Sequence, residues 1–372
     1  MKLYCIAGEA SGDLHGANLI KALKVQQPDL QCRAWGGDLM QAAGAELVRH
    51  YRDLAFMGFV EVARNLRTIL GNIAFCKRDI LAYQPDALVL IDYPGFNLRI
   101  ARWAKTQGLK VIYYISPQIW AWHSSRVHAI RRDVDQVLVI LPFETDFFLK
   151  YGVQVQFVGH PLLDVLDLSG NGKNGEEEIA EGLPVIALLP GSRRQEVQRI
   201  LPAMLSVTPY FPAYRFVVAG ATSLPADFYQ PFLARYPHVS ILTGQTYALL
   251  RQAKAALVKS GTSTLEAALL RVPQVVCYAG NSLSYQIAKR LVNVKYISLV
   301  NLIMDRPLVR ELIQDDLNTD NLRSALTEML DPVQVAELQQ GYTELRRRLG
   351  DGGASARAAA AILAAVPHPV EG

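Results

Sequence analysis

The chain opens with MKLYCIAGEASGDLHGANLIKALKV, residues 1–25, in which an apolar run meets a glycine-bearing turn and then a helical pattern. Leu3–Ala7 has the length and composition of a buried strand, and Ala17–Val25 has the periodicity of a helix. A strand that passes through glycines into a helix is the repeating unit of parallel α/β sheets. The apolar run is too short for a signal peptide, so we expect the protein to be cytoplasmic.

This alternation of strands and helices continues along the chain and is interrupted once. Further strands are predicted at Cys32–Trp35, Ala87–Asp92, Lys110–Ile115, Gln136–Leu141 and Val155–Val158, and then at Val185–Leu189, Arg215–Ala219, Val239–Leu242, Ala255–Lys259 and Gln274–Tyr278. The polar, glycine-rich run 169–178 is typical of a linker. We therefore predict an α/β fold with two Rossmann-like domains, residues 1–168 and 182–335, that face each other across a cleft. A helix at about residues 340–366 can pack back on the first domain.

The composition is that of a globular protein with a large interior. Of the 372 residues, 51% are apolar and 19% are charged, and the absence of a long uncharged run predicts no transmembrane helix. The formal net charge of +4 suits anionic ligands or an anionic membrane surface but is too small for a nucleic-acid-binding protein. The four cysteines lack metal-binding or redox spacing, and no other cluster indicates a metal, so we expect neither metal nor cofactor.

The turn after the first strand carries the first candidate site residues. They are Glu9, Ser11, Gly12, Asp13 and His15. Backbone N–H groups at such a helix start can hold an anion or a sugar hydroxyl, and Glu9 and His15 are candidates for acid–base catalysis. The alternative is that Ser11 or Asp13 only caps the helix.

The predicted strand Ala87–Asp92 ends in a carboxylate that is followed by Tyr93-Pro94-Gly95-Phe96-Asn97. An apolar strand that runs into an acid presents that acid at the mouth of a cleft in many α/β enzymes. Asp92 is therefore the first candidate for a general base. The alternatives are that it caps the next helix or pairs with a structural arginine.

Aromatic and histidine candidates follow two later strands of the first half. Trp120 and Trp122 lie on a proline-containing stretch and can stack on sugars or line an acyl pocket. His160, between a glycine and a proline, can point into the cleft. Core positions for the tryptophans and a structural role for the histidine are the alternatives.

In the second half, two strands lead through glycine turns into helices. Gly191, Ser192 and Arg193 follow the first of them, and a helix start with an arginine can grip a diphosphate. The alternative is a helix capped by a box of Ser192 and Gln195, with Arg193 in solvent.

The second of these turns follows the predicted strand Ala255–Lys259. Backbone N–H groups and hydroxyls at Gly261, Thr262 and Ser263 form a second anion site, and Glu266 can accept both hydroxyls of a ribose. A capping box of Ser263 and Glu266 is the alternative. Two helix starts and an arginine can stabilise a departing diphosphate without a metal.

Six motifs in this order together resemble the lipid-A-disaccharide synthase family. They are residues 7–13 (AGEASGD), 91–97 (IDYPGFN), 116–122 (SPQIWAW), 141–144 (LPFE), 189–193 (LPGSR) and 259–266 (KSGTSTLE). The resemblance implies an inverting glycosyltransferase of the GT-B type. Such an enzyme joins UDP-2,3-diacylglucosamine to 2,3-diacylglucosamine 1-phosphate by a β-1,6 bond and releases UDP. The first domain would bind the acceptor, and the second would bind the UDP-sugar.

The resemblance also implies roles for single residues. Asp92 would be the catalytic base, Arg193 an essential diphosphate contact, and Asn301 a contact to the nucleotide. Two positions depart from the family pattern: Gly95 stands where an acid is usual, and His123 stands where an arginine is usual. These departures put acceptor recognition in doubt, not the reaction class.

Residues 56–81 contain an apolar turn and a helical pattern with basic neighbours. Met57 and Phe59 are candidates for contact with acyl chains and an anionic membrane, which would place the protein peripherally at the inner face of the inner membrane. Packing on the domain's own core explains the pattern equally well. An oligomer also remains open.

Three other functions fit parts of the pattern. A UDP-N-acetylglucosamine 2-epimerase or a lipid II-type N-acetylglucosaminyltransferase would use the same two-domain architecture. A non-catalytic nucleotide-sugar sensor would need Arg193 and Glu266 but not Asp92.

Overall fold

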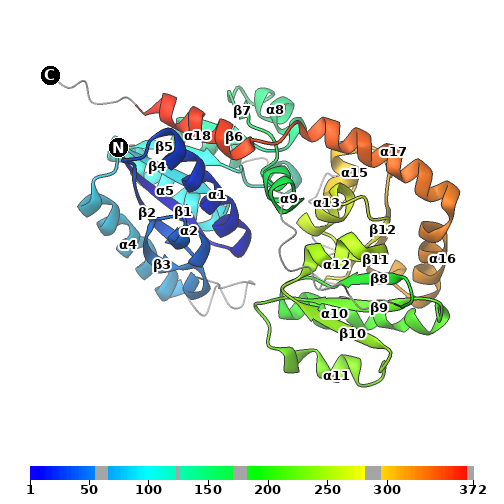
Figure 1. Ribbon diagram of the computed structural model, residues 1–372. Coiled ribbons are helices and arrows are strands. Elements are labelled where there is room, and N and C mark those ends of the chain that lie inside the picture. Colours follow the sequence, from blue (N-terminus) through cyan, green and yellow to red (C-terminus); the bar gives the residue numbers. More distant parts are fainter. Residues whose placement is uncertain (55–65, 123–125, 171–181, 281–294, 367–372) are drawn as a thin grey trace. The chain divides into compact units, whose positions relative to one another are not determined.

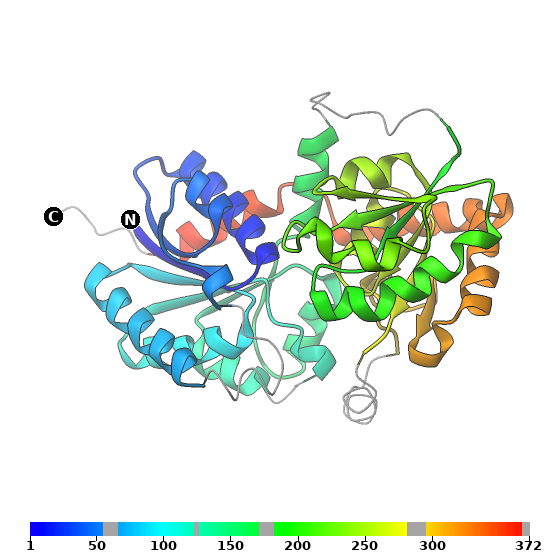
Figure 2. The same cartoon turned by 90° about the horizontal axis from the view of Figure 1, so that it is seen from below.

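The computed structural model describes residues 1–54, 66–122, 126–170, 182–280 and 295–366. The chain divides into two compact units, which are Met1–Leu168 with Leu349–Gly372, and Ser169–Arg348. Each unit contains a parallel sheet with helices on both faces (Figures 1 and 2). The α/β class and the Rossmann-like architecture predicted from the sequence are therefore confirmed.

Unit 1 is built on a seven-stranded parallel sheet in the order β3-β2-β1-β4-β5-β6-β7. Its strands are β1 Lys2–Ala7, β2 Gln31–Gly36, β3 Glu46–His50, β4 Ala87–Ile91, β5 Lys110–Tyr114, β6 Gln136–Val139 and β7 Gln156–Phe157. Its helices are α1 Ala10–Gln26, α2 Asp38–Ala42, η1 Tyr51–Leu54, α4 Leu66–Tyr83, α5 Pro94–Thr106, α6 Ile119–Trp122, α7 Arg126–Asp133, α8 Pro142–Leu149, α9 Leu162–Gly170 and α18 Ala354–Ala365. β4 is buried along its whole length, and β1 is buried from Leu3 to Ala7, because helices cover both faces of these central strands.

Unit 2 repeats the architecture with six parallel strands in the order β10-β9-β8-β11-β12-β13. The strands are β8 Val185–Leu189, β9 Arg215–Gly220, β10 Val239–Thr243, β11 Ala253–Lys259, β12 Gln274–Tyr278 and β13 Arg310–Ile313. The helices are α10 Arg194–Ser206, η2 Thr208–Tyr210, η3 Ala226–Phe228, α11 Gln230–Leu233, α12 Thr246–Gln252, α13 Thr262–Leu269, α15 Leu299–Met304, η4 Gln314–Asp316, α16 Thr319–Leu330 and α17 Pro332–Leu349.

Each sheet has one point at which the strand order reverses. In unit 1 it lies between β1 and β4, and in unit 2 between β8 and β11. Ligands of doubly wound sheets bind at the carboxyl ends of the strands that flank this point, since the two following loops there diverge to opposite faces. We therefore expect ligand-binding residues on the loops that begin at Gly8, Asp92, Pro190 and Ser260.

The C-terminal helix α18 packs on α1 of unit 1. Asp164 on α9 holds its first turn, because the carboxylate accepts hydrogen bonds from the backbone N–H groups of Gly353 (2.6 Å), Ala354 (3.1 Å) and Ser355 (2.8 Å). The carbonyl of Val158 accepts a further bond from Arg357 Nε at 2.9 Å.

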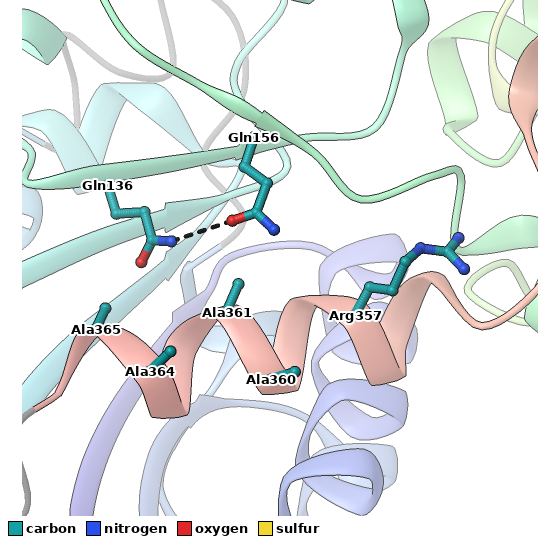
Figure 3. Close-up of a pocket in the computed structure, with 7 residues that line it drawn as sticks. All are labelled: Gln136, Gln156, Arg357, Ala360, Ala361, Ala364 and Ala365. Carbon is teal, nitrogen blue, oxygen red and sulfur yellow. Dashed lines mark hydrogen bonds between the residues drawn. The ribbon is translucent and has the colours of Figure 1, made fainter.

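Beside α18 lies a shallow pocket in which alanines face Gln136 and Gln156 (Figure 3). These glutamines are the first residues of β6 and β7, and Gln136 Nε2 donates to Gln156 Oε1 at 3.4 Å. The pocket thus lies at the amino ends of the strands, on the opposite edge from the reversal point. It is not part of the candidate site.

Candidate functional site

Asp92 directly follows β4, beside the end of β1, at the reversal point of unit 1. Ala7 pairs with Ile91 in the sheet, so Gly8 and Asp92 begin adjacent loops. Asp92 and Tyr93 have φ of 44° and 49°, a left-handed conformation that non-glycine residues seldom adopt. The ring of Tyr93 lies over Gly8, where an added Cβ would come within 2.3 Å of it. The close approach of the two loops therefore requires glycine at position 8.

Two buried side chains fix the backbone of Asp92. Its carbonyl accepts hydrogen bonds from Tyr113 Oη at 2.6 Å and from Asn97 Nδ2 at 2.8 Å. Asn97 is fully buried and also donates to the carbonyl of Ile6, so it joins the β1 and β4 loops. Tyr93, not Asp92, is the N-cap of α5, and the Tyr93 side chain makes no capping hydrogen bond. The alternative that Asp92 caps the next helix is therefore wrong.

In the β1 loop, Glu9 and Asp13 have different environments. Glu9 is half-buried. The pKa of Tyr93 is raised mainly because Tyr93 itself is buried, and the negative charge of Glu9 raises it further. Asp13 is only 3% exposed, and its carboxylate accepts from the N–H groups of Gly37 (2.7 Å), Leu39 (3.2 Å) and Met40 (3.0 Å). It therefore holds the start of α2, and we do not retain Asp13 as a substrate contact.

Neither Ser11 nor Asp13 caps α1. The N-cap is Glu9, without a side-chain capping bond, so that alternative is also wrong. Ser11 is exposed, and Gly12 packs against Ala7, where an added Cβ would meet the Ala7 Cβ at 3.1 Å. Capping of α2 explains the position of Asp13, and packing on Ala7 explains that of Gly12.

The two histidine candidates are buried and hold depressed pKa values. Burial lowers the pKa of His15 to about 4 and that of His160 to about 3, and for His160 the neighbouring His15 lowers it further. His160 Nδ1 accepts from the N–H of Leu162 at 3.2 Å. Both imidazoles are therefore neutral near pH 7, and with 7% and 2% exposure they are placed to support the unit rather than to meet a substrate.

A carboxyl group that the sequence analysis did not single out lies at the ends of β5 and β6. Glu144 is 1% exposed and accepts from Ser116 Oγ (2.7 Å) and from the N–H groups of Leu141 (2.9 Å) and Ile140 (3.2 Å). Burial raises its pKa to about 7. The acid at the third position of a helix that begins with proline was the available signal.

Trp120 belongs to the same corner of unit 1. Its ring meets Phe143 edge-on, with centroids 4.9 Å apart. Trp120 is half-buried, so it has both a core contact and a solvent-facing side. The side chain of Trp122 and the candidates Met57 and Phe59 lie outside the described residues, as does His123. At the other departure, Gly95, an added Cβ would meet no atom within 4 Å among the described parts of the chain.

In unit 2, the loop Pro190–Arg193 joins β8 to α10 at the reversal point. Gly191 has φ of 110°, and an added Cβ there would lie 2.6 Å from Glu196 Oε2, so only glycine fits. The N-cap of α10 is Arg193, whose side chain makes no capping hydrogen bond. The predicted capping box of Ser192 and Gln195 is therefore wrong. The Arg193 side chain is 49% exposed and its Nη1 lies 3.6 Å from Glu196 Oε1.

The second loop joins β11 to α13. The N-cap is Gly261, so a capping box of Ser263 and Glu266 does not form. Glu266 instead accepts a hydrogen bond from Tyr247 Oη at 3.2 Å. Burial raises the pKa of Glu266, while hydrogen bonds from Tyr247 and Ser263 oppose the shift. Thr262 is exposed at the helix start.

Asn301 has a different position from the one expected of a direct ligand contact. It is 1% exposed, its Nδ2 donates to the Val309 carbonyl (2.8 Å) and to Glu311 Oε1 (2.9 Å), and its Oδ1 accepts from the Val309 N–H at 2.9 Å. The amide is fully used in holding α15 against β13. We therefore assign Asn301 a supporting role.

The sequence model of the lipid-A-disaccharide synthetase family matches residues 3–365. The chain belongs to this family. It is 38% identical over 374 residues to the lipid-A-disaccharide synthase of Trichlorobacter lovleyi, covering 98% of this chain and 97% of the relative. It is 40% identical to that of Geobacter metallireducens, with 97% and 96% covered, and 40% identical to that of Syntrophus aciditrophicus, with 96% of each covered. The family resemblance stated from the six motifs is confirmed.

Solved structures resemble this family member in fold. The UDP-GlcNAc 2-epimerase of Neisseria meningitidis bound to UDP-GlcNAc matches with a TM-score of 0.71 at 14% identity, covering 98% of this chain and all of that one. The glycosyltransferase of kitacinnamycin matches with a TM-score of 0.67 at 16% identity, covering 98% and 99%. The GT-B-like class is therefore confirmed, and the likeness to epimerases extends to the fold alone.

Within the ranges that the structure describes, no helix combines the length and the apolar character needed to cross a bilayer. Likewise, no three His, Cys, Asp or Glu side chains in the described part of the chain gather as a metal site.

Proposed function

We propose that this chain joins a UDP-linked 2,3-diacylglucosamine to 2,3-diacylglucosamine 1-phosphate through a β-1,6 bond, with inversion, and releases UDP. Family membership supports the formation of a lipid A disaccharide. The observation that carries the detail is the chemistry of the two reversal points. One presents a carboxylate on a rigid loop, and the other presents two helix starts with cations.

In this proposal Asp92 is the general base. It removes the proton from the 6-hydroxyl of the acceptor as that oxygen attacks the anomeric carbon of the donor, and the bond from that carbon to the diphosphate oxygen breaks. Buried bonds from Asn97 and Tyr113 hold the Asp92 backbone, which is the preorganisation that a positioned base needs. Glu9, on the adjacent loop, is the alternative base, and the buried His15 and His160 are not.

Unit 2 would bind and stabilise the leaving UDP. Its new negative charge would be stabilised by Arg193 and by the N–H groups at the starts of α10 and α13, contributed by residues from Gly191 to Arg193 and from Gly261 to Ser263. Glu266 is half-buried beside Tyr247 and would accept the ribose hydroxyls. These roles need no metal.

The acylated substrates reside in a bilayer, so we also propose that the enzyme associates peripherally with the inner face of the inner membrane. Met57 and Phe59 are the candidate contacts. Trp120, with one side on Phe143, is the candidate for stacking on the acceptor sugar.

The test is turnover by the purified enzyme with acylated UDP-glucosamine and the acylated 1-phosphate acceptor in mixed micelles. We expect release of UDP that requires both substrates and a product with a β-1,6 bond. An epimerase would instead convert UDP-GlcNAc without an acceptor, and a sensor would bind the donor without releasing UDP. Either result, with no disaccharide formed, would contradict the proposal.

A further inference from the structure

Three charged side chains meet at the reversal point of unit 2. Lys259 is the last residue of β11, and its Nζ lies 2.9 Å from Glu196 Oε1 on the first turn of α10. The same Glu196 oxygen lies 3.6 Å from Arg193 Nη1. Two cations, one from the β8–α10 loop and one from the end of β11, thus converge on one carboxylate. Of these three side chains, only Arg193 was predicted from the sequence to contact the diphosphate.

We propose that Lys259 is a second cation of the diphosphate site, held ready by Glu196. This inference rests on the proposed function, because it assumes that the nucleotide binds to unit 2. It adds Lys259 to the diphosphate site. It also gives Glu196 a role, which is to hold both cations in position until the diphosphate binds to them.

The surroundings of the ion pair favour a ligand site over a structural bridge. Lys259 and Glu196 are 22% and 19% exposed, so both charges are partly removed from water at a cost that a single ion pair scarcely repays. The carboxylate already has a favourable place on the first turn of α10, since the helix dipole stabilises an acid there. Stability alone therefore gives little reason for the lysine.

The backbone of both glycine turns lies close to these charged side chains. An added Cβ on Gly191 would reach Glu196 Oε2 at 2.6 Å, and one on Gly261 would lie 3.6 Å from Lys259 Nζ. The N–H groups at the two helix starts and the two cations are thus neighbours, and all of them attract the same kind of ligand, an anion of more than one charge. Counting Arg193, Lys259 and Glu196, one positive charge is left in excess.

The two cations have complementary geometry. Arginine offers a planar fork for two phosphate oxygens, whereas lysine offers a compact charge on a flexible stem. Lys259 can therefore turn from Glu196 to a phosphate oxygen by rotation of its side chain, with the backbone unchanged.

The experiment compares the affinities of UDP and uridine for the full chain by titration calorimetry, with uridine measured by competition. In Lys259→Met we expect UDP to bind about 10-fold to 100-fold more weakly, the range for loss of one charged hydrogen bond, and uridine to bind as to the unchanged protein. The salt dependence of UDP binding should fall as well. Arg193→Met should behave in the same way.

Lys254→Met is the matched control, because Lys254 is an exposed residue near the start of the same strand. It should leave both affinities unchanged. Uridine binding shows that unit 2 is folded in each variant, and Lys259→Gln serves if the methionine variant does not fold. UDP affinity within twofold of the unchanged protein, in a variant that still binds uridine, would overturn the role of Lys259. No UDP binding by the unchanged protein would overturn the proposed function instead.

Discussion

Acidification from pH 7.5 to pH 5 should destabilise unit 1 through its two buried histidines. Their folded pKa values of about 4 and about 3 lie below the ordinary value of 6.5. Below pH 6.5 these two histidines therefore bind protons in the unfolded chain but not in the folded chain. The contribution of these two residues to the free energy of unfolding is present in full above pH 6.5 and decreases as the pH falls toward the folded pKa values.

The magnitude follows from the linkage relation. At pH 5 a histidine with an unfolded pKa of 6.5 and a folded pKa of 4 or lower loses about 2 kcal/mol relative to pH 7.5, so the pair loses about 4 kcal/mol. Glu144 acts in the opposite direction, because its folded pKa of about 7 lies above the ordinary 4.5. Glu144 binds a proton in the folded state, so acidification over the same interval adds about 2 kcal/mol to the free energy of unfolding. The net loss expected from the three groups is about 2 kcal/mol.

The assay is urea unfolding followed by tryptophan fluorescence at both pH values. All four tryptophans, Trp35, Trp103, Trp120 and Trp122, lie in unit 1, so the signal reports that unit by itself. His15→Gln should reduce the acid loss by about 2 kcal/mol, and Glu144→Gln should increase it by about the same amount. If both variants keep the pH dependence of the unchanged protein, the burial argument for these groups is wrong.

The remaining expectations concern catalysis and the membrane. Asp92→Asn should lower kcat by about 10²–10⁴ with UDP affinity nearly unchanged; turnover within a few-fold of normal would move the role to Glu9. Arg193→Ala should cost about 2–4 kcal/mol in kcat/KM for the donor while the protein stays folded, and a normal kcat/KM would remove it from the diphosphate site. Replacement of Met57 and Phe59 by serine should reduce binding to anionic vesicles at fixed ionic strength, and unchanged binding would assign them to the core.

The strands of the interior were predictable, and two of the four edge strands were not. Val185–Leu189 and Gln274–Tyr278 were predicted with the bounds that β8 and β12 have, because central parallel strands are continuous apolar runs. The edge strands β7 and β10 were predicted, whereas β3 and β13, at the opposite edges of the two sheets, were missed. Their sequences, ELVRH and RELI, are rich in charge, since an edge strand is partly solvated and gains from charge there. They lack the apolar signal on which the prediction relied.

The candidate site was predictable as a set of strand ends but not as a set of side-chain roles. Both predicted capping boxes failed because α10 begins one residue later, and α13 two residues earlier, than the patterns require, and a shift of that size changes which residue is the cap. Lys259 was missed for a different reason. A lysine at a strand end has the pattern of a solvated charge, and its partner Glu196 lies on a helix that follows another strand.

The conformation of the Asp92 loop is the part of the site that sequence patterns could least predict. Asp92, Tyr93 and Ile115 all have positive φ, at the ends of the neighbouring strands β4 and β5. Such conformations cost about 1–3 kcal/mol each for non-glycine residues, and hydrogen bonds offset part of that cost, among them the bond from the Asp92 N–H to the Ile115 carbonyl at 3.2 Å. Glycine at position 92 would relieve the strain but would remove the carboxylate. The chain keeps an acid where glycine would be more stable, and this is the pattern expected when the direction of that acid matters to function.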